Sequence, residues 1–248
     1  MIVIGKNSIL EILNSTPKDL NKIILLKTLK PEPRLKQIVH LAEENGINKI
    51  YLNRYDFARY FDNKNKEEGI SQGVIGFMKD YEYKPLNKMV EDNKKIVNPL
   101  ILILDEITDP HNFGAIIRSA VCLCADGIII PRHNSAEVNH TVIKTSSGSV
   151  NYIPIAKETN LNNSINYLKN NGYWIVGTEM KASKTIFEMD FKMPIGLLIG
   201  NEGKGVRKSL IDKCDFIVRI PMSEKLDSLN VSVSTGVFLY EILRQKNA

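Results

Sequence analysis

Short apolar runs alternate with helical patterns over the first third of the chain. The runs with the length and apolar character of strands are residues 22–26, 49–52 and 73–78. Apolar residues recur at helical spacing over residues 8–13, 33–45 and 55–61. Gly46 follows the second of these segments, and glycine commonly ends a helix. The pattern predicts a small α/β domain over residues 1–78.

A charged and weakly periodic stretch follows, from residue 79 to residue 98. It is rich in Lys, Asp, Glu and Asn, and only residues 86–91 show a helical pattern. Such a composition is typical of a segment that connects two domains. We therefore predict a linker over residues 79–98.

The remaining residues, 99–248, begin with a strand pattern that is apolar at every position. Residues 100–104 read Leu-Ile-Leu-Ile-Leu, as in a strand buried on both faces of a parallel sheet. Further strands are expected at residues 127–130, 152–155, 174–177, 196–199 and 216–218. Helices are expected at residues 112–124, 139–147, 160–171, 206–213 and 230–245. Because strands and helices alternate, we predict a doubly wound α/β domain.

The composition excludes several classes of protein. With 43% hydrophobic and 25% charged residues, the chain has the composition of a globular protein rather than a disordered one. No apolar run approaches the ~18–20 residues of a membrane span, and no signal-peptide pattern is visible. The three cysteines form no C-x-x-C pair, which favours a reducing cytoplasm, and the four histidines lack metal-ligand spacing. We expect a cytoplasmic protein without a membrane or metal partner.

The net charge of +5 lies mostly in the first part of the chain. Residues 1–97 hold 17 Lys and Arg against 13 Asp and Glu, whereas residues 98–248 hold 16 against 15. A positive first domain suits a polyanionic partner such as a nucleic acid. A solvated, lysine-rich surface explains the charge equally well, so both interpretations stay open at this point.

Unusual residues follow the predicted strands, where open parallel sheets bind their ligands. After residue 104, Asn112 is expected to cap a helix, and Arg118 lies six residues further along this mostly apolar helix. An exposed or ion-paired arginine is the plain alternative. After residue 199, a turn contains three glycines together with Asn201 and Glu202. Its spacing fits neither a P-loop nor a dinucleotide fingerprint, and a tight connector is the alternative.

A third stretch, residues 219–233, contains a short polar loop before the last helix. Ser228 or Asn230 can cap that helix, whose N-terminal turn offers free backbone N–H groups. Serine and asparagine at such positions are most often only caps. Taken alone, this stretch does not indicate a function.

Together, the three stretches resemble a known family. The order N-x-G-x-x-x-R, then I-G-N-E-G-x-G, then I-P-M followed by S-L-N-V-S is similar to the SpoU/TrmH family of RNA ribose 2′-O-methyltransferases, which belongs to the SPOUT superfamily. The resemblance covers residues of about 100–246. Residues 4–13 and 71–75 resemble the start and end of the ribosomal-protein-like substrate-binding domain found in the RlmB-type branch.

The resemblance implies a fold and a reaction. The expected fold is a C-terminal SPOUT domain with a mostly parallel sheet and a trefoil knot, preceded by a small α/β domain that binds the substrate. The expected reaction is S-adenosylmethionine-dependent methylation of a ribose 2′-hydroxyl, in a 23S rRNA guanosine near the peptidyl-transferase centre. Another rRNA or tRNA nucleotide is the alternative target.

The resemblance also assigns residues to roles. The expected catalytic group is Arg118, with Asn112, Glu202, Ser228 and Asn230 around it. The expected cofactor-binding residues are Thr178, Gly200, Ile220, Met222 and Leu229. A homodimer is also implied, for which the last helix offers an apolar face formed by Val233, Val237, Tyr240, Ile242 and Leu243.

Two positions depart from the family pattern. Glu224 stands where the family usually has glycine after I-P-M, and Ser71 stands where a histidine commonly precedes Gln72. The first puts the backbone and charge near the cofactor in question, and the second bears on RNA contact. Two other classes of protein stay open, namely a non-catalytic rRNA-binding protein and an enzyme that uses a different nucleotide.

Overall fold

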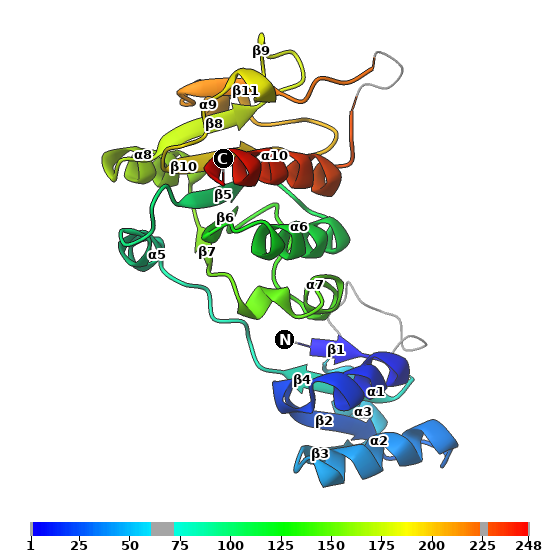
Figure 1. Ribbon diagram of the computed structural model, residues 1–248. Coiled ribbons are helices and arrows are strands. Elements are labelled where there is room, and N and C mark those ends of the chain that lie inside the picture. Colours follow the sequence, from blue (N-terminus) through cyan, green and yellow to red (C-terminus); the bar gives the residue numbers. More distant parts are fainter. Residues whose placement is uncertain (1, 61–71, 224–227, 248) are drawn as a thin grey trace. The chain divides into compact units, whose positions relative to one another are not determined.

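The computed structural model describes residues 2–60, 72–223 and 228–247, and the chain forms two compact units (Figure 1). Unit 1 spans Met1–Tyr81 and unit 2 spans Glu82–Ala248. Each unit has its own sheet. Ser71 and Glu224, at which the sequence departs from the family pattern, lie outside the described residues.

Unit 1 is built on a four-stranded sheet in the order β1-β4-β2-β3. Its strands are β1 (Ile2–Ile4), β2 (Leu20–Leu26), β3 (Asn48–Leu52) and β4 (Val74–Met78). Its helices are α1 (Lys6–Ser15), α2 (Pro33–Glu44) and α3 (Arg54–Ala58), with a 3₁₀ turn at Pro17–Asp19. Strand β4 is antiparallel to both neighbours, whereas β2 and β3 are parallel. The pattern missed β1, and α3 ends at Ala58 among the described residues.

Unit 2 contains a seven-stranded sheet in the order β7-β6-β5-β10-β8-β11-β9, and every pairing is parallel. Its strands are β5 (Leu100–Leu104), β6 (Gly127–Pro131), β7 (Ile155–Glu158), β8 (Trp174–Thr178), β9 (Lys184–Thr185), β10 (Ile195–Ile199) and β11 (Phe216–Arg219). All residues of β5, β6 and β10 are buried, as the apolar runs predicted. The predicted α/β fold with a mostly parallel sheet is confirmed.

Helices cover both faces of this sheet (Figure 1). They are α5 (Leu86–Asn93), α6 (Pro110–Cys122), α7 (His140–Thr145), α8 (Leu161–Asn170), α9 (Lys208–Ile211) and α10 (Val231–Lys246), with 3₁₀ turns at Ser149–Asn151 and Ile186–Glu188. Helices α5, α8 and α9 pack on one face, and α6 packs against α7 and α10. No helix among the described residues is long and apolar enough to cross a membrane. The trefoil knot stays a prediction.

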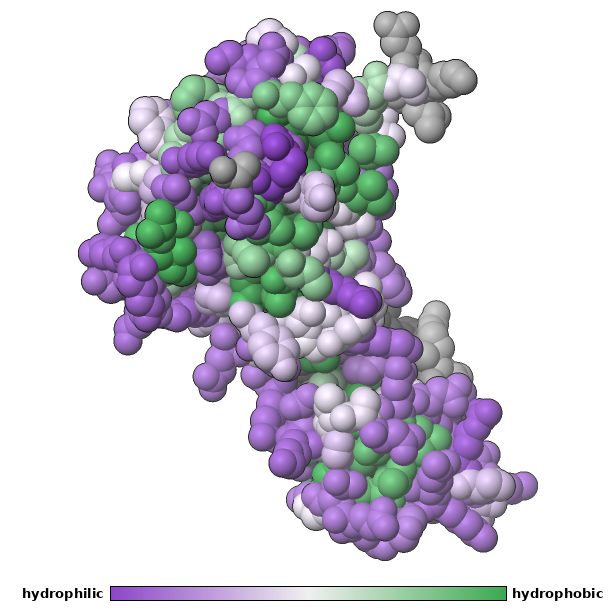
Figure 2. All heavy atoms as spheres, in the orientation of Figure 1, coloured by the Kyte–Doolittle hydropathy of each residue, from purple (hydrophilic) through white to green (hydrophobic). Residues whose placement is uncertain are grey.

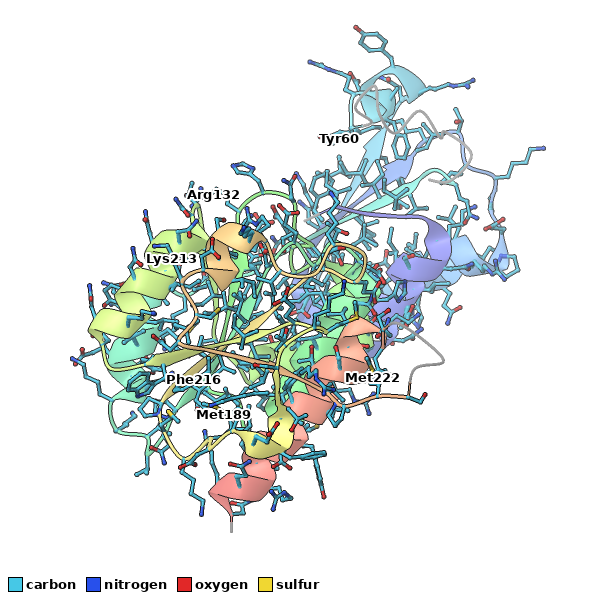
Figure 3. The ribbon with its side chains drawn as sticks, turned by 90° about the horizontal axis from the view of Figure 1, so that it is seen from above. Tyr60, Arg132, Met189, Lys213, Phe216 and Met222 are labelled. Carbon is cyan, nitrogen blue, oxygen red and sulfur yellow. The ribbon has the colours of Figure 1, made fainter. Side chains whose placement is uncertain are left out.

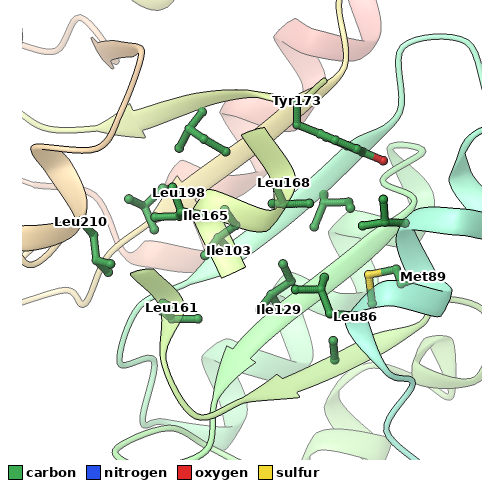
Figure 4. Packing of buried hydrophobic residues seen from close by; sticks show 14 residues of the cluster. Leu86, Met89, Ile103, Ile129, Leu161, Ile165, Leu168, Tyr173, Leu198 and Leu210 are labelled. Atoms are coloured by element: carbon green, nitrogen blue, oxygen red, sulfur yellow. The ribbon is translucent and has the colours of Figure 1, made fainter. Parts of the chain in front are cut away.

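The prediction of a linker over residues 79–98 is wrong for the segment that forms α5. Leu86, Met89 and Val90 are buried in the same cluster as Ile103 of β5 and Ile129 of β6 (Figure 4). The helical pattern at residues 86–91 was recognised, but its apolar positions form a single face that packs into the core of unit 2 instead of lying in a connecting segment. Unit 2 therefore begins near residue 82 rather than at residue 99.

Two further expectations differ from the structure. The strand predicted at residues 152–155 begins only at Ile155, because Ser149–Asn151 forms a 3₁₀ turn before it. The helix that follows β5 is capped by Asp109, whose Oδ1 accepts the His111 N–H at 3.0 Å, and Pro110 occupies the first turn. Asn112 is thus not a cap, and its side chain is available for other contacts.

Candidate functional site

A tight turn follows β10 and closes on itself. The backbone N–H of Asn201 donates to the Gly205 carbonyl at 3.1 Å, and the Gly205 N–H donates to the Asn201 carbonyl at 2.8 Å. A Cβ atom on Gly200 would lie 2.2 Å from the Gly205 carbonyl carbon and from the Val206 nitrogen. Gly205 itself has a left-handed φ of 67°. Glycine at position 200 is therefore required by close backbone approach.

The side chain of Asn201 fixes this turn to the end of β5. Its Oδ1 accepts the Gly203 N–H at 2.9 Å, and its Nδ2 donates to the Glu106 carbonyl at 2.9 Å. Glu106 has a left-handed φ of 56°, which is uncommon for a residue other than glycine. Asn201 thus stabilises a bend of the chain between β5 and α6.

An ion pair between the buried Asp105 and the exposed Arg207 makes a second connection between the same two segments. Asp105, which is 1% exposed, accepts the Arg207 backbone N–H at Oδ2 (2.9 Å) and the Arg207 Nε–H at Oδ1 (2.8 Å). The hydrogen bond with Asp105 raises the pKa of Arg207 above its ordinary value. The sequence reasoning missed this pair, although a carboxylate directly after a wholly apolar strand was the available signal.

Glu202 joins the three motifs. Its Oε1 accepts hydrogen bonds from Asn112 Nδ2 at 2.7 Å, from Asn230 Nδ2 at 2.6 Å and from the Val231 N–H at 3.2 Å. Asn230 Nδ2 also donates to Asn112 Oδ1 at 3.0 Å. Asn230 caps α10 by accepting the Ser232 N–H at 2.9 Å. Three of the five predicted catalytic residues therefore lie in one hydrogen-bonded group.

Arg118 lies outside that hydrogen-bonded group. It is exposed on α6 and makes no hydrogen bond or ion pair with the residues that the structure describes. Gly114, one turn earlier, allows α6 to pack closely on α7, since a Cβ atom there would lie 2.7 Å from Thr145 Cβ. The glycine of N-x-G-x-x-x-R therefore serves helix packing, while the arginine side chain is left available for a ligand.

A pocket of about 380 Å³ lies beside the Glu202 group. It is bounded by residues that follow β8, β10 and β11 and by the start of α10. All five predicted cofactor-binding residues line it, namely Thr178, Gly200, Ile220, Met222 and Leu229, and so do Glu202 and Ser228. The Thr178 hydroxyl donates to the Leu198 carbonyl at 3.0 Å. Figure 3 labels Met222, which follows β11 and faces this pocket together with residues of α10.

The pocket contains charged residues that the sequence reasoning did not single out. They are Glu179, Lys181, Lys204 and Arg219. The Arg219 Nε–H donates to the Ala182 carbonyl at 3.0 Å, so its position is fixed by the loop that follows β8. Among the described residues, no group of three or more His, Cys, Asp or Glu side chains could hold a metal ion.

Cys214, which packs against β8, is not a nucleophile. Burial raises the pKa of Cys214 to about 12, so the thiol stays protonated at neutral pH. It packs against Gly177, where a Cβ atom would lie 2.7 Å from Cys214 Sγ.

This arrangement has counterparts in known proteins. A profile of the SpoU rRNA methylase family matches residues 99–240, more than half of the chain. The chain belongs to this family. A second profile, for the substrate-binding domain of RNA 2′-O ribose methyltransferases, matches residues 2–84. The SpoU domain thus lies within unit 2, although α5, which precedes the matched residues, completes its core.

Individual relatives match almost the whole chain. A Bacillus subtilis (strain 168) protein, whose name assigns it to the TrmH family of tRNA/rRNA methyltransferases, is 37% identical over 99% of this chain and 96% of its own length. The 23S rRNA (guanosine-2′-O-)-methyltransferase RlmB of Pseudomonas aeruginosa is 35% identical over 98% and 96%. The crystal structure of an AdoMet-bound rRNA methyltransferase from Sinorhizobium meliloti aligns with a TM-score of 0.64 and 26% identity, covering 98% of this chain and 86% of that one.

Proposed function

We propose that this protein transfers a methyl group from S-adenosylmethionine to a ribose 2′-hydroxyl of RNA. The observation that carries the proposal is the Glu202 group, in which Glu202 lines a pocket with all five expected cofactor residues and holds Asn112 and Asn230 by hydrogen bonds. Membership of the SpoU family supports the reaction type. The AdoMet-bound state of the Sinorhizobium meliloti enzyme supports the choice of cofactor.

In this proposal the pocket binds the cofactor mainly through its backbone. S-adenosylmethionine supplies a methyl group already activated by its sulfonium sulfur. The carbonyl and N–H groups around Gly200, Ile220 and Leu229 hold the adenosine and methionine parts, which explains why their side chains are small or apolar. The turn closed by Asn201 holds the backbone groups of Gly200 in a fixed geometry, as orientation of two reactants requires.

Arg118 and Asn112 act on the RNA side. Arginine stays protonated at neutral pH, so Arg118 is not the base that removes the hydroxyl proton. Its free guanidinium holds a phosphate or the ribose hydroxyl of the target nucleotide. The proton then leaves to a phosphate oxygen or to water. Asn112, fixed by Glu202 and Asn230, orients the ribose.

The proposed target is a guanosine of 23S rRNA near the peptidyl-transferase centre, and the site of action is the cytoplasm. The RlmB relative at 35% identity and the match to the substrate-binding domain support this target. Mapping of 2′-O-methyl groups in rRNA and tRNA from a deletion strain tests it. Loss of a methyl group at another rRNA or tRNA nucleotide would replace the proposed target but keep the reaction.

Two other classes of protein, a non-catalytic rRNA-binding protein and an enzyme that uses a different nucleotide, can be distinguished from this proposal by calorimetry and a transfer assay. We expect the purified protein to bind S-adenosylmethionine and to show no comparable binding of NAD or ATP. A non-catalytic rRNA-binding protein would bind RNA without transferring a labelled methyl group. Absence of transfer to both unfractionated rRNA and unfractionated tRNA from the deletion strain would contradict the proposal.

We also propose a homodimer formed through α10. Val233, Val237 and Tyr240 are 52%, 38% and 63% exposed on this helix, whereas Ile242 is buried in the core of the unit. The apolar face predicted from the sequence is therefore smaller than expected, because Ile242 does not belong to it. Light scattering at micromolar concentration should give twice the mass of the chain, and a fully active monomer would contradict the dimer.

A further inference from the structure

Unit 1 contains a groove of about 320 Å³ that lies outside the residues carrying the methyltransferase motifs. It is bounded by the end of β2, by residues 27–31, by one side of α2 and by Tyr51 of β3. Its apolar lining consists of Leu25, Leu26, Leu29, Pro31, Leu35 and Val39. Figure 2 shows that hydrophobic residues reach the surface of this unit among hydrophilic ones. The volume lies at the lower end of the range of ~300–1,000 Å³ for small-ligand sites.

The rim of the groove is positively charged. Residues 27–36 include Lys27, Lys30, Arg34 and Lys36, and the one acid in this segment, Glu32, forms an ion pair with Lys6 at 2.9 Å. The acid on the other side of the groove, Glu43, is neutralised by an ion pair with Lys49. Lys27 and Lys36 line the groove and form no ion pair with any described residue. The positive charge is therefore available to a polyanion.

Tyr51 adds an aromatic surface to one side of the groove. Its side chain is 48% exposed, although it lies on a strand whose neighbouring residues Ile50 and Leu52 pack around Phe57 on the opposite face. An exposed aromatic ring beside an apolar lining can stack on a nucleobase, and such stacking tolerates any base. Exposed lysines at the rim can contact the phosphates on either side of that base.

We propose that this groove binds one unpaired nucleotide of the RNA substrate. The base lies against Tyr51 and the apolar lining, and the adjacent phosphates contact Lys27 and Lys36. This inference rests on the proposed function, because it assumes that the substrate is RNA. It assigns to unit 1 a defined site for single-stranded RNA. The site should accept any of the four bases, because stacking on an aromatic ring does not depend on the base.

The test uses the full-length protein and two RNA probes. The first is a twelve-nucleotide oligouridylate, and the second is a transcript of the 23S rRNA region that carries the peptidyl-transferase guanosine loop. Tyr51→Ala is compared with Tyr55→Ala, since Tyr55 is 79% exposed in the same unit but does not line the groove. The double variant Lys27→Glu/Lys36→Glu is compared with Lys18→Glu/Lys79→Glu, which changes the net charge by the same amount away from the groove.

We expect Tyr51→Ala to weaken oligouridylate binding by about tenfold, as loss of one stacked base does. The Lys27/Lys36 variant should also lower the slope of log Kd against log salt concentration by about 1.4, which corresponds to two lost phosphate contacts on a single strand. At a single salt concentration, the Kd of both control variants for oligouridylate should stay within about twofold of that of the unmodified protein. Binding of S-adenosylmethionine should be unchanged in all variants, which also shows that they fold.

Equal effects of the groove and control variants would overturn the inference, and so would failure of the unmodified protein to bind either RNA. A tenfold effect of Tyr51→Ala on oligouridylate, together with no methylation of the transcript, would support the groove and contradict the proposed target. Photo-crosslinking of a 4-thiouridine-containing oligonucleotide gives a direct readout. The crosslink should map to the peptide that contains Tyr51, and a crosslink confined to other peptides would contradict the inference.

Discussion

A few side chains hold the candidate site together at the scale of single residues. The same Glu202 oxygen accepts three hydrogen bonds, two from asparagine side chains and one from the first turn of α10. Hydrogen bonds to a carboxylate are roughly twice as strong as those between neutral groups. By contrast, Arg118 forms no hydrogen bond or ion pair with the described residues, as expected for a side chain that binds a ligand.

We predict that Arg118→Ala lowers the rate of methyl transfer at least about a hundredfold, as loss of a charged group at a reacting centre does. Affinity for S-adenosylmethionine should change by less than about twofold, because Arg118 does not line the pocket. Single-turnover methylation and calorimetry measure the two effects. Arg132→Ala, another exposed arginine of unit 2, is the control. A parallel loss of cofactor affinity would make Arg118 a cofactor residue instead.

For Glu202→Gln we predict a folded protein whose rate at saturating cofactor falls by about ten- to a hundredfold. The variant keeps the shape of the side chain but weakens hydrogen bonds that are worth ~1.5–3 kcal/mol each when one partner is charged. Glu179→Gln removes a second carboxylate from the same pocket, and only backbone hydrogen bonds of Glu179 are found among the described residues. An equal loss in both variants would show that the charge matters and the connection between motifs does not.

At the scale of elements, the ends of β5 and β10 are connected twice. Asn201 donates to the Glu106 carbonyl, and Arg207 forms its ion pair with Asp105. The segment after β10 forms the pocket, and the segment after β5 leads into the helix that carries Asn112 and Arg118. A displacement of one segment must therefore displace the other, because neither can move alone without breaking these contacts.

We predict that Asp105→Asn weakens cofactor binding and lowers the unfolding free energy by about 1–3 kcal/mol, the cost of a poorly satisfied buried polar group. A matched control exists in the same unit. Asp215 accepts the Ile175 N–H at 2.8 Å and Lys169 Nζ at 2.7 Å, and so has the same kinds of donor. Asp215→Asn should reduce stability without changing cofactor affinity, since Asp215 is not at the pocket. Equal cofactor affinity in the two variants would contradict a positioning role for Asp105.

The two units divide the molecule into parts with different chemistry. All residues of the three motifs lie in unit 2, whereas unit 1 holds 13 Lys and Arg against 10 Asp and Glu in only 81 residues, compared with 20 against 18 in unit 2. Helix α5 belongs to unit 2, because Leu86, Met89 and Val90 are buried in its core. The boundary at which the chain can be cut is therefore near residue 82.

We predict that a fragment of residues 82–248 folds and binds S-adenosylmethionine, whereas a fragment that starts at residue 98 is less stable by several kcal/mol. The difference arises from the lost burial of three apolar side chains, each worth ~1.5–3 kcal/mol. Gly127 would also lose its contact with Met89. Denaturant titration measures this difference. Equal denaturant midpoints of unfolding for the two fragments would contradict a stabilising role of α5.

The fragment 82–248 should also lose most of its affinity for the 23S rRNA transcript. Phosphate contacts dominate such binding and weaken steeply with salt, whereas a cofactor held by backbone groups should respond little. Filter binding at several salt concentrations, compared with the full-length protein, provides the measurement. Methylation of the transcript at the full-length rate would show that unit 1 does not recognise the RNA.

Much of this protein is determined locally and can be read from the sequence. Apolar periodicity indicated the central strands and the main helices, because burial on a sheet or helix face imposes a fixed spacing. The resemblance of the three motifs to the SpoU/TrmH family implied the cofactor-binding residues, and Thr178, Gly200, Ile220, Met222 and Leu229 all line the pocket. Spacing also indicated the helix at residues 86–91, but the charged residues around it favoured a linker, whereas α5 belongs to the core of unit 2.

Only the tertiary structure decided which of these residues touch. Asn112 and Glu202 are 90 positions apart in the chain, and Asn112 and Asn230 are 118 apart. The sequence predicted a helix cap for Asn112, whereas the structure gives that role to Asp109 and places Asn112 beside Glu202. It also showed that Asp105 pairs with Arg207 and that Ile242 is core. Such contacts depend on the order of strands in the sheet, which no local pattern encodes, and that order brings the three motifs together.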